Sequence, residues 1–494
     1  MKTNYTILLL FLTVLSFGQA PTIVWNYAMP EKVDRTSPAI ADDGTVYIAC
    51  DYTTRNVLGQ GNTEPNIFAI NPNNTLKWQA SITEGILFDK VDQIQSSPSI
   101  NADGSIFMGG HFGRRIYKLN SANGSFTTRD LGSRIRYTAP AYSTSGDVII
   151  ATRNNGNKGV RNLSADLLTE NWIAASTIDF NSTPAVGADG SVYAISTNGN
   201  IYAFNADGSA KWNASYGVGG FASSAIAIGS NGTVYASAKL NAAGDGVLKA
   251  YNPVNGTEFW SVTFTGENAE QGGPAIAADG TVYLGTAGGK MRAFNPTTGA
   301  INWTYTASAA IEVVPAIDNA GKIYFGTTDG MFYVLNPDGS QAYTPLDLGD
   351  KINSSAAIGT DGRIYVLSTT GTGANSGKLY ALTTTATGLQ TGGWAMYGKN
   401  AKHTSNVNAI TLSNYSIDAI ENLKIVNPVL NKELQIFSRI NEPIAVEIFD
   451  MQGKLLLDTL VNNNSLDVSA IQSGIYLAKF SQEGKTAVKK LIIK

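Results

Sequence analysis

Seven of the chain's twelve arginines lie in one short stretch, between His111 and Arg161. Nine basic and two acidic residues give this stretch a net charge of +7, whereas the whole chain carries −3. A planar guanidinium group binds carboxylate, sulfate or phosphate through two parallel hydrogen bonds. The stretch therefore predicts a binding face for an acidic glycan or a surface phosphate, with these candidate residues: Arg114, Arg115, Arg134, Arg136 and Arg153. The simpler alternative is an ordinary charged rim whose arginines point in different directions.

Residues that could carry catalysis are sparse. The two histidines, His111 and His403, occupy unrelated places in the pattern, so a His-based metal centre or a Ser-His-Asp triad has little support. We predict that His403 is structural and that His111 is a surface histidine. The single Cys50 can form no internal disulfide and is predicted to be a small buried residue in a strand. Catalysis by a pair of carboxylates stays open, but the sequence offers no way to choose the pair.

A repeated unit accounts for most of the chain. Each copy opens with a strand of small residues, passes through a turn that is usually Asp-Gly or Asn-Gly, and continues as an alternating strand with Tyr. A third strand ends in Asn, and a fourth contains Trp. The turn glycines recur at intervals of 60, 42, 44, 42, 48, 41 and 41 residues, at Gly44, Gly104, Gly146, Gly190, Gly232, Gly280, Gly321 and Gly362. A four-stranded unit repeated about every 40–45 residues is typical of a propeller blade.

The recurring residues have structural explanations. Glycine accepts a positive φ in a tight hairpin, and the Asp beside it is predicted to form the turn, because a calcium site needs several oxygen ligands. Six aromatic residues are predicted to pack between neighbouring blades: Trp25, Trp78, Trp172, Trp212, Trp260 and Trp303. The Trp25 segment precedes the first complete unit, and the eighth unit lacks an ordinary Trp strand. Pairing the two would close the ring, and a strand at 391–398 is the alternative partner.

The unit S-P-A-I…D-G-T-V-Y…L-Y-A-L-N…G-x-x-K-W resembles the pyrroloquinoline-quinone-like (PQQ-like) propeller repeat over residues 22–405. The segment Gly393-Trp394-Ala395-Met396, followed by His403, is similar to the ending of such arrays, with Ala395 in place of Pro. This resemblance implies a fold shared by quinone-dependent dehydrogenases, an outer-membrane assembly scaffold and many binding proteins. The dehydrogenases hold their quinone with an adjacent cysteine pair, a calcium ion and an Asp base. Cys50 alone cannot supply that pair, so PQQ is not expected and no cofactor is predicted.

A different pattern follows a polar linker at residues 406–421. Residues 422–494 contain short alternating runs, typical of antiparallel strands in a small immunoglobulin-like β-sandwich. The elements Ser473-Gly474-Ile475-Tyr476-Leu477 and 489–494 resemble those of the type A C-terminal sorting domain of the Bacteroidetes type IX secretion system. This resemblance implies recognition by that secretion machinery, passage through the outer membrane and removal of the domain, with release or attachment to surface lipopolysaccharide. An ordinary immunoglobulin-like binding module is the alternative.

The N-terminus also predicts export. Lys2 precedes an apolar run at residues 7–17, and small residues follow, as in a signal peptide at residues 1–20. The run is too short for a membrane helix, and no later stretch is long and apolar enough for one. Charged residues make up 15% of the chain, fewer than in most globular proteins, as suits an extracellular all-β protein. The sequence therefore predicts an all-β fold, with an eight-bladed β-propeller of four-stranded blades at residues 21–405 and the sandwich at 422–494.

Three classes of function are compatible with these features. We favour a secreted, extracellular or surface-attached propeller that acts as a ligand-binding or protein-interaction scaffold, because this role needs only what the sequence shows. An extracellular carbohydrate-active or other hydrolytic enzyme is the main alternative, and a quinoprotein oxidoreductase comes last. The net charge gives no indication of a nucleic-acid partner. The expected partners are the secretion machinery, through 422–494, and an acidic polysaccharide or a surface protein. The long insertion at 51–66 is a second candidate site.

Overall fold

The computed structural model describes two compact units, Met1–Ala409 and Ile410–Lys494. The described residues are 20–51, 65–82, 94–154, 156–175, 177–197, 199–215, 224–370, 376–383, 388–408, 424–425, 429, 432–437, 443–450, 454–462, 465–482 and 485–493. The predicted signal peptide, most of the 51–66 insertion and nearly all of the linker lie outside them. These residues contain no helix with the length and apolar character needed to cross a bilayer.

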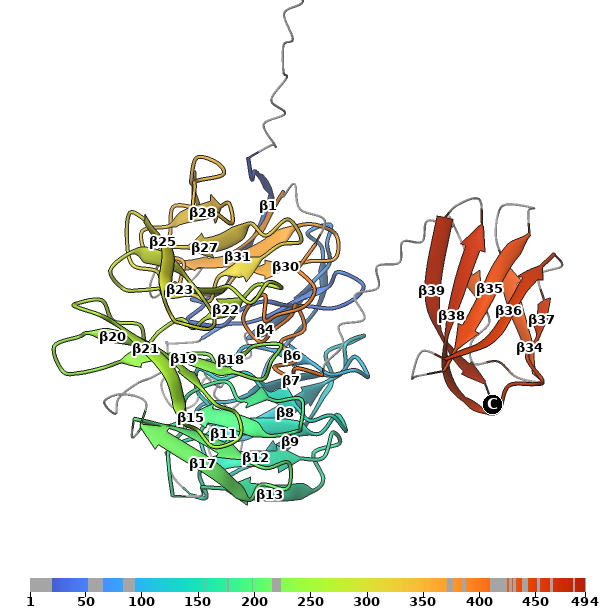
Figure 1. Ribbon diagram of the computed structural model, residues 1–494, viewed down its shortest axis with the longest axis horizontal. Coiled ribbons are helices and arrows are strands. Elements are labelled where there is room, and N and C mark those ends of the chain that lie inside the picture. The colour runs from blue at the N-terminus through green and yellow to red at the C-terminus, as the bar shows by residue number, and fades with distance from the viewer. Residues whose placement is uncertain are drawn as a thin grey trace, which may run out of the picture. The chain divides into compact units, whose positions relative to one another are not determined.

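The first unit consists, in its described residues, of eight four-stranded antiparallel sheets (Figure 1). In seven of them the four strands follow one another along the chain. Sheets 1 to 4 contain β2 (Ala39–Ile40), β3 (Val46–Ala49), β4 (Ile67–Ile70) and β5 (Leu76–Ala80); β6 (Ser99–Ile100), β7 (Ile106–Gly109), β8 (Arg115–Leu119) and β9 (Phe126–Asp130); β10 (Ala141–Tyr142), β11 (Val148–Thr152), β12 (Gly159–Leu163) and β13 (Glu170–Ala174); and β14 (Ala185–Val186), β15 (Val192–Ile195), β16 (Asn200–Phe204) and β17 (Ala210–Ser215). Sheets 5 to 7 contain β18 (Ala227–Ile228), β19 (Val234–Lys239), β20 (Gly246–Tyr251) and β21 (Glu258–Phe264); β22 (Ala275–Ile276), β23 (Val282–Gly285), β24 (Lys290–Phe294) and β25 (Ile301–Thr306); and β26 (Ala316–Ile317), β27 (Ile323–Gly326), β28 (Met331–Leu335) and β29 (Leu346–Asp347).

Sheet 8 joins the two ends of the repeat array. Its first three strands are β30 (Ala357–Ile358), β31 (Ile364–Thr369) and β32 (Gly377–Leu382), and its fourth is β1 (Ile23–Met29), the blue strand of Figure 1. β1 runs antiparallel to β32, with Trp25 opposite Ala381. The predicted pairing of the Trp25 segment with the eighth unit is therefore confirmed. The alternative closing strand is wrong, because Trp394 pairs with Ile276 of β22 instead.

Local chemistry explains the repeated hairpin between the first two strands of each sheet. Both residues of every innermost strand are buried, which suits the small or compact side chains found there. The eight repeated turn glycines have φ between 74° and 89°, a conformation that other residues adopt at a cost. The turn Asp accepts the backbone N–H two residues later, as Asp43 does from Thr45 at 2.9 Å and Asp279 does from Thr281 at 2.9 Å. These carboxylates therefore stabilise the turns.

Residues 388–408, here called the axial segment, connect the innermost strands. Main-chain carbonyls of this segment accept hydrogen bonds from the second residue of the innermost strand in six different sheets. The donors are Ile40, Ile100, Tyr142, Val186, Ile276 and Ile317. Six strands can share one short segment only if they converge on it, as blades converge on the axis of a propeller. The axial segment therefore marks one end of that axis, next to the hairpin turns.

The second unit contains two sheets in its described residues. One joins β33 (Lys424–Ile425), β34 (Glu433–Phe437) and β37 (Ser465–Asp467), and the other joins β36 (Leu455–Val461), β35 (Ile444–Phe449), β38 (Gly474–Gln482) and β39 (Lys485–Ile493). Alternate residues of β35 and β38 are buried, among them Val446 and Phe480. The all-β propeller prediction is confirmed, whereas the count of eight blades and the immunoglobulin-like class of this unit stay predictions.

Candidate ligand-binding site

Polar side chains occupy one repeated position at the end of the axis opposite the axial segment. The position lies four residues before the first residue of each innermost strand. In the described residues it holds Arg35, Gln95, Tyr137, Asn181, Gln271, Glu312 and Asn353. We call these seven residues the entry ring, because the chain enters the innermost strands there. Repeat symmetry therefore brings one polar side chain from each of seven sheets toward the axis.

Arg35 spans the entry ring. Its Nη2 donates to Oε1 of Gln271 in the loop before β22, at 2.7 Å. Its guanidinium also lies over the ring of Tyr137, which precedes β10, at 5.1 Å from the ring centroid. Arg35 belongs to the loop before β2, so these contacts join sheet 1 to sheets 3 and 6, which are not its neighbours. Arg35 and Tyr137 have φ of 57° and 55°, and non-glycine residues held in this region are often functional.

A second guanidinium lies on the same aromatic ring. The Arg136 guanidinium is 4.4 Å from the centroid of Tyr137. Arg136 also donates from Nη2 to the Tyr137 hydroxyl at 2.7 Å and from Nε to Oε1 of Gln95 at 2.6 Å. Gln95 in turn donates to the buried carboxylate of Asp51 at 2.8 Å. Burial raises the pKa of Asp51, although Gln95 and Lys32, whose Nζ is 3.2 Å from that carboxylate, act in the opposite direction.

Arg153 completes the cationic group. It follows β11, is only 7% exposed, and donates from Nη1 to Oδ1 of Asn181 at 2.9 Å. Its backbone forms two hydrogen bonds with that of Arg134, whose guanidinium lies 4.9 Å from the ring centroid of Phe112. Burial lowers the pKa of Arg153, and the neighbouring charge of Arg136 lowers it further, while Asp179 acts against both. An arginine keeps its charge under such conditions, so this group attracts anions.

The structure divides the arginines that the sequence had grouped. Arg134, Arg136 and Arg153 come together beside the entry ring. Arg114 directly precedes β8 and Arg115 is its first residue, and no contact joins their side chains to this group among the described residues. The other two arginines of the stretch have structural partners: Arg129 donates to the carbonyls of Leu167 and Leu168, and Arg161 pairs with Glu170 and the carbonyl of Leu131.

The six tryptophans contact the following sheet. Each indole N–H donates to a main-chain carbonyl of the turn between the third and fourth strands there, at 2.8–3.0 Å. The acceptors, in order from Trp25 to Trp303, are Pro72, Ser121, Ala206, Pro253, Pro296 and Pro337. In five cases the ring also covers the turn glycine so closely that a Cβ there would overlap it.

Both histidines are buried, which agrees with the prediction for His403 but not with that for His111. His403 is fully buried, and its Nδ1 lies 2.8 Å from the carbonyl oxygen of Pro98, which fits a structural role. The prediction that His111 is a surface histidine is wrong, since it is only 6% exposed. The Phe112 ring lies 4.3 Å from that of His111, and Arg134 covers Phe112 in turn. Cys50 is buried at the end of β3, as predicted, and burial raises the pKa of its thiol.

Analysis of the linear sequence missed Arg35, Tyr137, Gln95 and Gln271. Charge density along the chain could not find them, because each comes from a different repeat. Alignment of the eight repeats on their innermost strands would have found them, since all four occupy the same column. The sequence therefore marks these residues by a polar residue at the same position in successive repeats, and not by a local cluster of charges.

The quinone of the related dehydrogenases does not fit the residues present. Cys50 is the only cysteine, so the chain cannot supply an adjacent cysteine pair, and its side chain is buried. In the described part of the chain, no three His, Cys, Asp or Glu side chains gather as a metal site would require. The entry ring contains four amides, the phenol of Tyr137, the guanidinium of Arg35 and the carboxylate of Glu312, which pairs with Lys351 at 2.9 Å. These groups suit recognition by hydrogen bonding.

Comparison with known proteins identifies relatives for two separate parts of the chain. Residues 244–412 match the family model of the outer membrane protein assembly factor BamB, and residues 427–494 match that of a secretion system C-terminal sorting domain. The chain is 31% identical over 173 residues to the outer membrane protein assembly factor BamB of Bordetella pertussis (strain Tohama I), an alignment that covers 33% of this chain and 40% of that protein.

Solved structures show the same fold at low identity. BamB from Moraxella catarrhalis has a TM-score of 0.53 and 16% identity, and the match covers 74% of this chain and all of that one. A europium-containing methanol dehydrogenase has a TM-score of 0.55 and 13% identity, over 74% of this chain and 93% of that one. The sorting domain marks the chain for export to the cell surface or beyond. The chain thus combines a propeller of PQQ-like, BamB-like repeats with a C-terminal secretion sorting domain.

Proposed function

We propose that this exported propeller is an extracellular binding protein that takes an anionic ligand at the entry ring. The observation that carries the proposal is the convergence of the Arg35 and Arg136 guanidinium groups on the ring of Tyr137, with the buried Arg153 close to Arg136. Guanidinium groups held by neighbouring side chains lose little further freedom on binding, so they favour a bound carboxylate, sulfate or phosphate.

The ligand class follows from the neighbouring residues. Gln95, Gln271 and Asn181 supply amide groups around the guanidinium groups, which suits a ligand that carries hydroxyl groups as well as negative charge. An acidic polysaccharide has both. A phosphate-bearing surface molecule is also negatively charged, and a binding experiment with both kinds of ligand distinguishes it from an acidic polysaccharide. The sorting domain provides the delivery, and the propeller provides the binding surface.

The test is a titration of the mature chain with alginate, chondroitin sulfate, inorganic phosphate and neutral dextran. We expect binding of at least one anionic probe, weakened as salt rises from low to physiological concentration because mobile ions screen the charges. The variants Arg35→Gln and Arg136→Gln should each weaken it by roughly tenfold, the loss expected for one charged hydrogen bond.

Arg129→Gln is the matched control, because Arg129 is bonded to carbonyl groups of Leu167 and Leu168 and lies outside the entry ring. It should bind as the wild type does. The proposal would be contradicted if the Arg35 and Arg136 variants bound the anionic probe as tightly as the wild type does. It would also be contradicted if dextran were the one probe that bound.

A further inference from the structure

A second candidate site lies at the other end of the innermost strands, beside the hairpin turns. It is a pocket of about 450 Å³ between sheets 5 and 6. Its walls come from the first hairpin of sheet 5, from Phe259 in β21, and from two turns of sheet 6 that contain Asp279 and Thr297. The pocket shares no residue with the entry ring.

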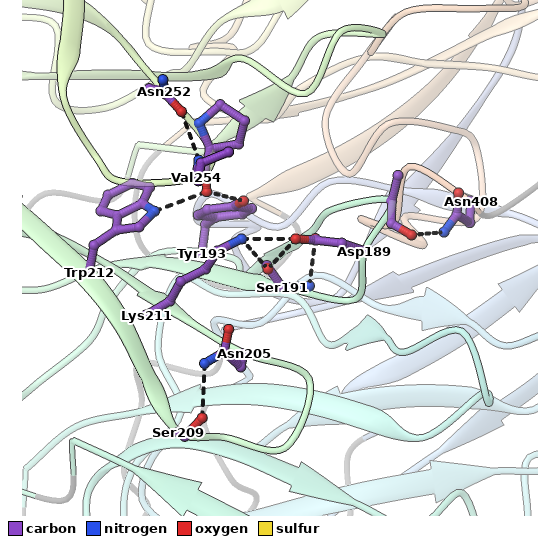
Figure 2. A network of polar contacts seen from close by, with 12 residues as sticks. Asp189, Ser191, Tyr193, Asn205, Ser209, Lys211, Trp212, Asn252, Val254 and Asn408 are labelled. Carbon is purple, nitrogen blue, oxygen red and sulfur yellow. Dashed lines mark hydrogen bonds and ion pairs between the residues drawn. The ribbon is translucent and has the colours of Figure 1, made fainter.

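Two residues that line this pocket differ from the residues at the same positions in two other repeats. In sheets 1 and 4 the residue before the fourth-strand Trp is a lysine, Lys77 or Lys211. Lys77 pairs with Asp43 of the first hairpin at 2.9 Å. Figure 2 shows the same arrangement in sheet 4, where Lys211 lies 2.8 Å from both Asp189 and the Ser191 hydroxyl. In those two sheets an ion pair joins the fourth strand to the first hairpin.

Sheet 5 has lost both members of that ion pair. Phe259 occupies the position of Lys211, and Asn231 occupies that of Asp189. The phenyl ring forms no ion pair with the turn and remains 54% exposed. A single exposed aromatic residue is ordinary on a protein surface. Here, however, the ring lines a pocket, at the position where two other repeats have a lysine paired with the turn.

Sheet 3 provides an internal comparison. Asn171 occupies the lysine position there, and a pocket of about 370 Å³ lies between sheets 3 and 4. The Asn171 amide donates to Oδ1 of Asn162 at 2.8 Å, so it is engaged within its own sheet. Both pockets have a residue other than lysine at this position, and both have an aromatic ring in the wall: the partly buried Trp172 in one and Phe259, 54% exposed, in the other.

The polar groups of the pocket are available to a ligand. The side chains of Ser230 and Thr297 form no hydrogen bond with any described residue. Asn231 and Asp279 each use one oxygen to accept a backbone N–H, from Thr233 at 3.0 Å and from Thr281 at 2.9 Å. The Asn231 amide nitrogen and the second Asp279 oxygen have no partner among the described residues. Donors and acceptors therefore surround the aromatic ring.

The charge of the lining restricts the ligand. None of the described lining residues is basic, and Asp279 is the one acidic side chain among them. An anionic ligand would meet a carboxylate with no cation to offset it. A neutral ring that has an apolar face and several hydroxyl groups matches both the phenyl ring and the hydrogen-bonding side chains. A sugar residue has this combination.

We propose that this pocket binds a neutral sugar residue, with the apolar face of the sugar against Phe259 and its hydroxyl groups on Asn231, Asp279 and Thr297. The site is separate from the anion-binding entry ring, so the propeller has two recognition surfaces. A polysaccharide with both neutral and acidic residues could engage them separately. The exchange of Lys for Phe is then a change of function within one repeat.

The test is a titration of the mature chain with cellohexaose, laminarihexaose and mannohexaose. Binding is measured by calorimetry and by saturation-transfer NMR. We expect at least one sugar to bind at concentrations up to about 10 mM, a range that covers weak single-site recognition. Phe259→Ala should weaken that binding by roughly tenfold, because it removes the aromatic contact. The double variant Phe259→Lys with Asn231→Asp should abolish it by rebuilding the ion pair of sheet 4.

Two controls make the result interpretable. Phe126→Ala removes another exposed aromatic side chain, 42% exposed in β9, and should leave sugar binding unchanged. Arg136→Gln should also leave it unchanged, which separates failure of this proposal from failure of the anion site. The proposal is overturned if no neutral sugar binds, if both Phe259 variants bind as the wild type does, or if the pocket takes tetramethylammonium or a peptide in preference to sugar. Unchanged melting temperatures would verify that the variants fold.

Discussion

At the scale of single residues, the role of each arginine depends on the residues that its side chain contacts and not on its neighbours in the sequence. The guanidinium groups of Arg134 and Arg136 lie over the rings of Phe112 and Tyr137. Those of Arg129 and Arg161 donate to main-chain carbonyl groups. The sequence shows these residues as one basic stretch because it does not record where each side chain points. By contrast, the structural role of each fourth-strand Trp could be predicted, since a large aromatic residue at a fixed place in every repeat must meet an equivalent environment each time.

The close fit of Trp260 against Gly299 gives a prediction at this scale. Gly299 has φ of 71°, and an added Cβ would lie 2.6 Å from Trp260 Cε3. Gly299→Ala should therefore lower the free energy of unfolding by the cost of the backbone conformation, about 1–2 kcal/mol, plus roughly 1–3 kcal/mol for displacing the indole. Chemical unfolding followed by Trp fluorescence measures the change.

Gly266→Ala is the matched control. Gly266 has φ of 68°, yet nothing lies within 4 Å of its added Cβ. This variant should show the backbone cost alone. If the two variants are equally destabilised, the indole is free to move aside, and the fit between Trp and glycine contributes little to stability.

At the scale of elements, the axial segment holds the innermost strands and a buried histidine. His403 donates from Nδ1 to the carbonyl oxygen of Pro98, and its Nε2 is buried without a hydrogen-bond partner in the described residues. Burial lowers the pKa of His403 to about 4. Its pattern of hydrogen bonds therefore favours the neutral imidazole, with the proton on Nδ1.

This gives a pH dependence of stability. The folded pKa of about 4 lies below the ordinary value near 6.5, so the unfolded chain binds the proton first as pH falls. The stability contribution is complete above pH about 6.5 and is lost progressively as pH falls toward 4, by roughly 3 kcal/mol in total. Unfolding free energies of the wild type and His403→Gln, measured across this range, should diverge. Parallel curves would show that other groups account for the acid sensitivity.

The paired ends of the repeat array were predictable, but the entry ring was not. Trp25 could be recognised as part of an orphan fourth strand because its segment precedes the first complete unit, and because the eighth unit lacks an ordinary Trp strand. The contact from Arg35 to Gln271 joins residues 236 positions apart, and nothing in the sequence near either residue indicates that the two meet. Periodicity determines which strands form, whereas the residues that meet on the axis depend on ring closure.

At the scale of the whole molecule, two units carry separate roles. The propeller holds both proposed binding surfaces, and the second unit matches a sorting domain. Their separate contact networks indicate that each has its own core. The function of the propeller should therefore not depend on the sorting domain once export is complete.

Deletion of residues 422–494 tests this division. The truncated chain should retain the propeller fold and its binding of anionic probes, yet it should accumulate inside the outer membrane. Cell fractionation with immunoblotting measures the location, and titration of the purified protein measures binding. Normal surface delivery of the truncated chain would contradict the assigned role of the second unit.

The axial segment also has a consequence for the timing of assembly. Its carbonyl groups serve six sheets, yet it follows every one of them in the chain, and β1 must wait for β32, some 350 residues later. Sheets made early therefore remain without their axial partners until the last residues of the unit arrive. A chain that ends before residue 388 lacks the carbonyl groups that six sheets share, whereas a chain that ends at residue 421 has them all. The propeller should therefore fold completely only after its own last segment has been made, whether or not the second unit follows.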